Sequence, residues 1–156
     1  MNKLLYAHYN IVFQEVPNET TLVFNISGCP HKCEGCHSKY LWDYVGHNLS
    51  EDIYKILDKY NGLITCVCFM GGDQNLYELN QLLYMIKRDY KLKTCVYSGS
   101  DNIHIFDNSL QFLDYLKIGR YDGEYGGLNE HTTNQKFYKV IDCKCEDTTN
   151  IFWNKQ

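Results

Sequence analysis

Residues 21–42, TLVFNISGCPHKCEGCHSKYLW, join a short apolar run to three closely spaced cysteines. The apolar and β-branched residues at 21–27 predict a strand that leads directly into the cysteine segment. Cys29, Cys33 and Cys36 have the spacing Cys-x3-Cys-x2-Cys. Three such thiolates can bind a metal ion, form disulfides, or ligate three irons of a four-iron cluster and leave the fourth iron open. The rest of the sequence helps to choose among these three uses of the cysteines.

The composition is that of one soluble globular domain, expected to span residues 1–156. Hydrophobic residues make up 44% of the chain and charged residues 22%, a balance that argues against disorder. The net charge of −4 provides no basic surface for nucleic acid. No apolar run approaches the length of a membrane span, and the N-terminal residues are a poor secretory signal. We therefore expect a cytoplasmic protein that binds neither nucleic acid nor a membrane.

Cysteine is abundant in this chain, with eight residues. In a reducing compartment these are metal ligands, catalytic groups or core residues rather than a disulfide framework. A closed zinc site would need a fourth ligand, which would have to be His31, His37 or a distant cysteine. Iron–sulfur clusters prefer thiolates, and Gly28 and Gly35 allow the tight turns that bring three sulfurs together. The segment favours a cluster and leaves a zinc site as the alternative.

Helices and strands alternate after the cysteine segment. The first helix is predicted from Ser50, as its N-cap, to about residue 61. The remaining predicted elements are strands at 63–70, 93–99, 113–119 and 135–141, a helix at 76–90, a weaker helix at 102–112 and a surface loop at 120–134.

This alternation predicts an α/β fold with a mostly parallel sheet and crossover helices. Ligands of such sheets bind at the carboxyl ends of the strands. The cysteine segment, GGD at 71–73 and YSG at 97–99 all follow predicted strands. We therefore expect these three segments to lie on one rim of the sheet.

The segment GCPHKCEGC, residues 28–36, resembles the cluster loop of the radical S-adenosylmethionine superfamily. That superfamily is defined by Cys-x3-Cys-x2-Cys after the first barrel strand. More narrowly, the chain resembles the small activating enzymes of anaerobic ribonucleoside-triphosphate reductase, which carry GGD after the second strand. The matching pieces FMGGD, VYSG, IGRYDGEY and TTNQKFY occur here in order, and the resemblance covers about residues 10–141.

The resemblance implies a partial, incomplete TIM-like β/α barrel of radical S-adenosylmethionine type and a set of cofactor ligands. Cys29, Cys33 and Cys36 would ligate a [4Fe–4S] cluster whose unique iron takes the amino and carboxylate groups of S-adenosylmethionine. The methionine-binding turn would be Gly71, Gly72 and Asp73. Gly35 would meet the adenine, and Ser98 would contact the ribose or the methionine.

The resemblance also implies an oxidoreductase activity and its partners. A flavodoxin- or ferredoxin-type donor would reduce the cluster, and reductive cleavage of S-adenosylmethionine would give methionine and a 5′-deoxyadenosyl radical. That radical would take a hydrogen atom from a glycine Cα of the large subunit of the reductase. The product would be a stored glycyl radical on anaerobic ribonucleoside-triphosphate reductase.

Two other functions remain open at this point. One is a radical S-adenosylmethionine enzyme that acts on a small molecule, similar to deazapurine synthases. The other is a zinc-binding interaction module without catalytic activity. For the GGD turn by itself, a helix cap provided by Asp73 would be the better interpretation, but its place after a buried strand and downstream of the cysteines favours ligand binding, with which capping is compatible. The family commonly has proline where this sequence has Gln74, and commonly has GSSNQ where this sequence has HTTNQ at 131–135.

The remaining cysteines are predicted to be structural. Cys66, Cys68 and Cys95 lie in apolar strands and are expected to be buried core residues. Cys143 and Cys145 could contribute to a second metal site, but two ligands do not complete one. An exposed or edge-strand pair is the favoured interpretation of these two.

Overall fold

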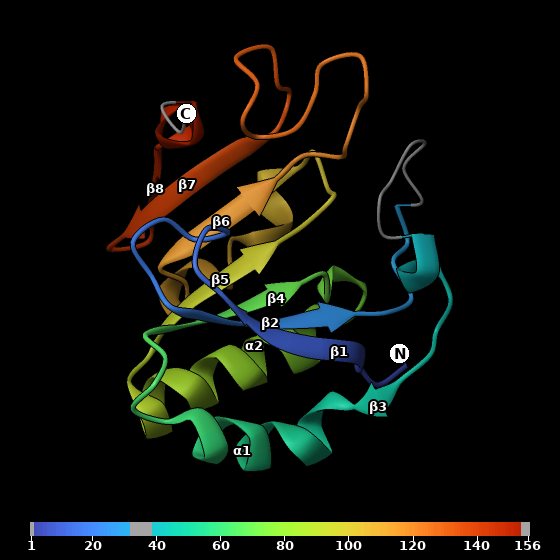
Figure 1. Cartoon of the computed structure of the whole chain (residues 1–156), viewed down its shortest axis with the longest axis vertical. Coiled ribbons are helices and arrows are strands. Elements are labelled where there is room, and N and C mark those ends of the chain that lie inside the picture. Colours follow the sequence, from blue (N-terminus) through green and yellow to red (C-terminus); the bar gives the residue numbers. More distant parts are fainter. Residues whose placement is uncertain (1, 32–38, 154–156) are drawn as a thin grey trace.

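The computed structural model describes residues 2–31 and 39–153, and its centre is an eight-stranded sheet of order β3-β1-β2-β4-β5-β6-β7-β8 (Figure 1). The strands are β1 (Leu5–Val12), β2 (Thr21–Ile26), β3 (His47–Asn48), β4 (Cys66–Met70), β5 (Lys93–Tyr97), β6 (Tyr115–Ile118), β7 (Lys136–Ile141) and β8 (Lys144–Asp147).

Two α-helices accompany the sheet in the described part of the chain. They are α1 (Leu49–Tyr60) and α2 (Leu76–Met85), and a π turn continues α2 over Ile86–Tyr90. Short 3₁₀ turns occur at Lys39–Trp42, Asp73–Asn75, Ile103–Phe106, Leu110–Phe112 and Thr149–Phe152.

The pairing of the strands differs between the centre of the sheet and its edges. The β2–β4, β4–β5 and β5–β6 pairs are parallel, whereas β1–β2, β1–β3, β6–β7 and β7–β8 are antiparallel. The sequence predicted a mostly parallel sheet, but parallel pairing is limited to these four central strands. A short connection explains one of these antiparallel pairs, the β7–β8 hairpin. Only Asp142 and Cys143 separate β7 from β8, which is too short for a crossover.

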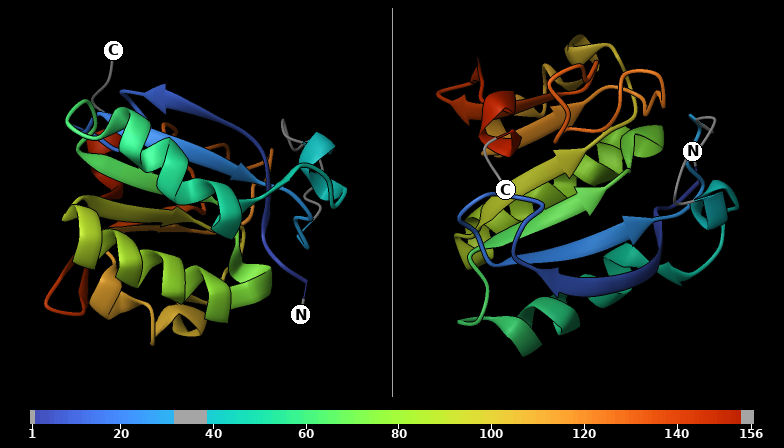
Figure 2. Two further views of the ribbon diagram at one scale, coloured as in Figure 1. Left: turned by 90° about the horizontal axis from the view of Figure 1, so that it is seen from below. Right: turned by 45° about the horizontal axis from the view of Figure 1, so that its top comes forward.

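Both helices lie on the same face of the sheet (Figure 2). Phe24 of β2 and Phe69 of β4 are fully buried between this face and helix residues such as Leu57 and Leu83. The four parallel strands are neighbours in the order in which the chain forms them. Successive β/α units therefore advance across the sheet in one direction with their helices on one side. This is the arrangement expected of part of a β/α barrel, and the barrel assignment remains a prediction.

The opposite face of the sheet carries a second, smaller core. Cys66, Cys68 and Cys95 are fully buried there, packed with Tyr115 and Phe137. The β1–β2 connection and the C-terminal 3₁₀ turn cover this face through Val16 and Phe152. The predicted burial of these three cysteines is therefore confirmed.

The N-terminus of α1 differs from the prediction. Asn48, not Ser50, is the N-cap, and its side-chain oxygen accepts a hydrogen bond of 3.2 Å from the backbone N–H of Glu51. Asparagine and serine cap helices about equally well, so propensity does not separate the two positions. The hydroxyl of Ser50 instead donates to Glu78 Oε1 of α2 at 3.0 Å. The hydrogen bond from Ser50 to α2 therefore explains why Asn48 rather than Ser50 caps α1.

The segment 102–112, predicted as a weak helix, forms the two 3₁₀ turns at Ile103–Phe106 and Leu110–Phe112. The side chain of Asn102 accepts from the backbone N–H of His104 and so begins the first turn. Phe106 is fully buried against the helix-side core. Burial of Phe106 anchors the segment without a continuous helix.

The buried carboxylate of Glu19 links the starts of β4, β5 and β6, at the opposite end of these strands from their carboxyl ends. Glu19 accepts hydrogen bonds from Thr65 Oγ1 at 2.7 Å, Tyr115 OH at 2.8 Å and Lys93 Nζ at 2.9 Å. Burial by itself would raise the pKa of Glu19, but these three hydrogen bonds outweigh it and lower the pKa below its ordinary value of 4.5. Glu19 therefore stabilises the fold as an ionised group.

We expect Glu19→Gln to lower the free energy of unfolding at pH 7 by about 2 kcal/mol, because charge-assisted hydrogen bonds are lost. The stabilisation by Glu19 is present above pH 4.5 and disappears as the pH falls through its lowered folded-state pKa. Denaturant unfolding at pH 7 and pH 3 should show the difference between variant and wild type shrinking in acid. The exposed Glu124, replaced by Gln, is the control. An equal difference at both pH values would contradict this assignment.

Candidate functional site

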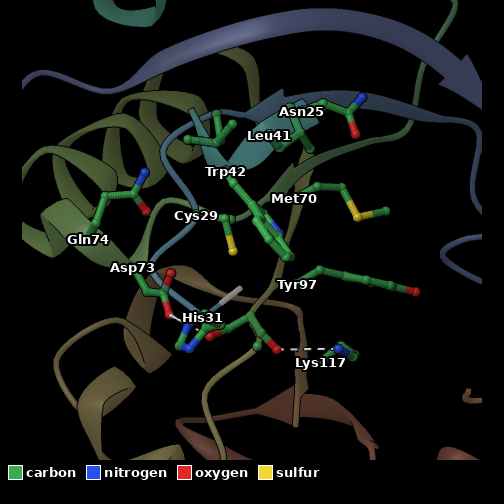
Figure 3. A pocket seen from close by; sticks show the side chains of 14 residues that line it. Asn25, Cys29, His31, Leu41, Trp42, Met70, Asp73, Gln74, Tyr97 and Lys117 are labelled. Carbon is green, nitrogen blue, oxygen red and sulfur yellow. Dashed lines mark hydrogen bonds and ion pairs between the residues drawn. The ribbon is translucent and has the colours of Figure 1, made fainter. Parts of the chain in front are cut away.

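A pocket of about 200 Å³ opens at the carboxyl ends of the parallel strands (Figure 3). Its lining comes from the segments that follow β2, β4 and β5 and from the end of β6. The lining residues that follow β2, β4 and β5 within a few positions are Cys29, His31, Gly71, Asp73, Gln74, Ser98 and Gly99. The structure therefore brings the described start of the cysteine segment, the GGD turn and the YSG segment to one rim of the sheet.

Only some of the site residues predicted from the sequence line this pocket. Cys29, Gly71, Asp73 and Ser98 line the pocket. Gly72 is not among the lining residues and instead begins the 3₁₀ turn at Asp73–Asn75. The other three predicted residues, Cys33, Gly35 and Cys36, lie outside the described part of the chain.

The described end of the cysteine segment is held firmly against residues 41–43. The backbone N–H of Cys29 donates to Leu41 O at 2.9 Å, and that of Gly28 donates to Asp43 O at 3.0 Å. Gly28 has φ +73°, a left-handed conformation that favours glycine, and this allows the chain to turn sharply after β2. The thiol of Cys29 is not in a disulfide, and its sulfur points into the pocket (Figure 3).

The GGD turn depends on the conformational freedom of its glycines. Gly71 and Gly72 have φ of +105° and +103°. A side chain at Gly71 would also meet Ile26 Cβ at 3.3 Å, and one at Gly72 would meet Leu79 Cδ1 at 3.3 Å. These glycines therefore shape the turn and pack it against its neighbours.

Gln74 ties this turn to the exit of β2. Its Nε2 donates to Ser27 O at 2.8 Å, and its Oε1 accepts from the backbone N–H of Gly72 at 3.2 Å. Proline could make neither contact. The departure of this sequence from the common family pattern therefore provides a direct link between the turn and the segment that precedes Cys29.

Asp73 does not cap the second helix. The N-cap of α2 is Asn75, whose side-chain oxygen accepts from the backbone N–H of Glu78 at 3.2 Å. The Asp73 carboxylate is only 5% exposed and accepts from His31 Nε2 and Ser98 Oγ, both at 2.8 Å. Asp73 is thus a buried, hydrogen-bonded carboxylate at the wall of the pocket, and the simple helix-cap interpretation is wrong.

Two further residues of the pocket were not identified from the sequence. Lys117, on β6, is 8% exposed, and its Nζ donates to Gly119 O at 2.8 Å and Ser98 O at 3.3 Å. The indole N–H of Trp42 is buried, and no residue in the described ranges accepts a hydrogen bond from it. A lysine inside the apolar run YLKI was the available signal for Lys117. Trp42 ends the aromatic LW segment after the cysteines, which belongs to the family resemblance, but the sequence analysis assigned it no role.

The buried cysteines behind the pocket are unsuited to metal binding. Burial raises the pKa of Cys66 and Cys95, so their thiols remain protonated, whereas metal ligation needs thiolates. Within residues 2–31 and 39–153, no group of three or more His, Cys, Asp and Glu side chains is arranged to hold a metal ion. Cys143 is exposed in the hairpin turn before β8, where Cys145 is half-buried. The described cysteines other than Cys29 are therefore structural or surface residues.

None of the described helices is long and apolar enough to cross a membrane. No curated protein and no solved structure is significantly similar to this chain. A family model described as a 4Fe–4S single cluster domain matches residues 19–140. The match runs from just before β2 to near the end of β7 and includes Cys29 and Asp73. It covers well over half of the sequence, and the chain therefore belongs to the family of 4Fe–4S single cluster domains.

Proposed function

We propose that this protein is a radical S-adenosylmethionine activase that generates a glycyl radical on anaerobic ribonucleoside-triphosphate reductase. One observation carries the proposal. The thiol of Cys29 and the carboxylate of Asp73 line the same pocket, at the carboxyl ends of consecutive parallel strands. A cluster loop and a methionine-binding turn need this proximity, because the unique iron and the amino acid part of the cofactor must meet.

The fold is consistent with this proposal. The parallel strands β2, β4, β5 and β6 follow chain order, and their helices lie on one face (Figure 2). We take this as a partial β/α barrel, whose ligands bind at the carboxyl ends of its strands. Because the described strands form an open sheet with β3 and β8 at its edges, a partner protein could approach a side that a complete barrel would close.

The chemistry of the pocket fits the two groups that the proposal requires. Cys29 offers a thiolate ligand, and the 4Fe–4S family requires one. The Asp73 carboxylate suits an α-ammonium group. The buried indole N–H of Trp42, without an acceptor in the described residues, suits a ligand that carries hydrogen-bond acceptors. Each donor or acceptor would therefore find a partner in the bound cofactor.

In this function Cys29, Cys33 and Cys36 would hold the cluster, and Gly71 and Asp73 would bind the methionine part of S-adenosylmethionine. When bound, the cluster would supply the one-electron reduction that cleaves S-adenosylmethionine and starts hydrogen-atom transfer from the partner's glycine. Asp73 orients the cofactor through its charge. The apolar faces of Met70 and Tyr97, which also line the pocket, exclude water from the reacting groups.

The decisive experiment is electron paramagnetic resonance on anaerobically reconstituted protein mixed with reductase, dithionite and S-adenosylmethionine. We expect a glycyl doublet and formation of 5′-deoxyadenosine. A reductase in which the radical-bearing glycine is replaced by alanine is the control, and it should give no doublet. Production of 5′-deoxyadenosine without a doublet on any glycyl-radical reductase would favour a small-molecule substrate. Stoichiometric zinc without iron would identify a zinc module and would refute the proposal.

A further inference from the structure

We propose that His31 is a positioning residue, which holds the Asp73 carboxylate in the orientation that receives the cofactor and thereby links the cysteine segment to the GGD turn. This inference rests on the proposed function and adds a residue to it. It is carried by three contacts among three different segments, all within the described residues, and Figure 3 shows the first of them, between His31 and Asp73.

The first contact is the hydrogen bond between the two side chains. His31 Nε2 lies 2.8 Å from Asp73 Oδ2, although 42 positions separate the residues in the chain. The imidazole is 21% exposed and the carboxylate 5%. A carboxylate without a proton can only accept a hydrogen bond, so toward that form of Asp73 the imidazole nitrogen is the donor. A hydrogen bond at such low exposure is stronger than one in water, and it fixes both side chains.

The second contact comes from Ser98. Its Oγ donates to the same Asp73 oxygen at 2.8 Å and accepts from the backbone N–H of Ser100 at 3.0 Å. Both hydrogen bonds that the described residues make to the carboxylate thus end on Oδ2. Oδ1 is left to receive the ammonium group of the cofactor. Because two donors hold Oδ2, the carboxylate is already oriented before the ligand arrives, which lowers the entropic cost of binding.

The third contact shows that the fold reserves space for the imidazole. A Cβ at Gly99 would lie 2.9 Å from His31 Cδ2 and 3.0 Å from His31 Cγ. Real Cβ atoms essentially never approach so closely, so any side chain at position 99 would displace the ring. Ser98 therefore supports the carboxylate of the pair, and Gly99 provides the space for its imidazole.

The protein contains a second histidine–aspartate pair that lacks these features. His104 Nδ1 lies 3.4 Å from Asp107 Oδ1, and the two side chains are 79% and 62% exposed. Exposed pairs of this kind contribute little. His104→Ala is therefore a matched control, because it removes an imidazole from an aspartate without altering the pocket.

The test measures the affinity for S-adenosylmethionine of the reconstituted protein by equilibrium dialysis. We expect His31→Ala to weaken binding about tenfold, the loss of one charge-assisted hydrogen bond. His31→Gln, whose amide can still donate to Asp73, should recover most of the affinity, and His104→Ala should match wild type. The bound iron should be the same in all these variants, because His31 positions Asp73 and does not ligate the cluster.

A second variant tests the same contact from the other side. Gly99→Ala keeps every polar group but displaces the ring, and we expect it to weaken binding to a similar degree. In the His31→Ala background, Gly99→Ala should have almost no further effect, because the ring that it displaces is absent. The electron paramagnetic resonance signal of the reduced cluster should change on cofactor addition in wild type, and less so in both single variants.

The outcomes separate this inference from the proposed function. If wild type binds S-adenosylmethionine and His31→Ala binds it equally well or more tightly, His31 has no positioning role. Additive effects of His31→Ala and Gly99→Ala would overturn the inference as well, and loss of iron in His31→Ala would make the residue a metal ligand instead. If wild-type protein with a complete cluster does not bind S-adenosylmethionine, the proposed function and this inference both fail.

Discussion

Replacing Cys29 with alanine is expected to reduce the iron bound after anaerobic reconstitution by at least about tenfold. The thiol points into the pocket, and the chain belongs to a family that binds a single 4Fe–4S cluster. A cluster held by three thiolates loses one third of its protein ligands in this variant. Iron and sulfide analysis together with the near-visible absorbance of the reconstituted protein would measure the loss.

Cys143→Ala is the matched control for this prediction. Cys143 is exposed in the turn between β7 and β8, outside the pocket. Its replacement should leave both the iron content and the absorbance unchanged. If Cys29→Ala retains the wild-type amount of iron and sulfide, Cys29 is not a ligand, and the assignment of the pocket is wrong. If both variants lose iron equally, the loss does not report on the pocket.

The second large effect is expected from Asp73→Asn. The substitution keeps the size of the side chain and an oxygen that can accept from His31 and Ser98, but it removes the negative charge. We expect the affinity for S-adenosylmethionine to fall about tenfold to a hundredfold, because a hydrogen bond between a carboxylate and an ammonium group is worth roughly 1.5–3 kcal/mol. The cluster content should not change. Equilibrium dialysis and iron analysis on the same preparation would measure both quantities.

Asp101→Asn is the control for this second prediction. Asp101 also follows β5, but its side chain is 55% exposed, it pairs with Arg120 at 3.2 Å, and it does not line the pocket. Its neutralisation should leave the affinity unchanged. If Asp73→Asn binds the cofactor as tightly as wild type, the GGD turn does not bind the ammonium group through this carboxylate.

Local sequence patterns were sufficient to predict most helices and strands at the centre of the sheet. The predicted helix at 50–61 corresponds to α1, and the predicted helix at 76–90 corresponds to α2 with the π turn that follows it. The apolar runs around Val67 and Val96 form β4 and β5. Such runs are informative because strands buried on both faces must be apolar throughout, a requirement that does not depend on the rest of the fold.

The edges of the sheet could not be predicted in the same way. The structure adds β1, β3 and β8, for which the sequence analysis made no prediction. In β1 only Tyr6 is fully buried, and polar residues such as His8 and Asn10 interrupt the apolar pattern. β3 has only two residues, His47 and Asn48. Strands of this kind are defined by the neighbour they pair with, and not by their own composition.

The sequence by itself determined that three thiols are closely spaced after a strand, and that a GGD turn follows the next buried strand. Both signals are local, because cluster ligation and a tight turn each impose residue types over a few consecutive positions. Only the tertiary structure decided that His31 and Ser98 meet on one oxygen of Asp73, that Gly99 leaves room for the imidazole, and that Lys117 lies buried beside them. These contacts join residues that lie far apart in the chain, such as His31 with Asp73 and with Gly99, and their geometry arises from the packing of parallel strands, which no short pattern encodes.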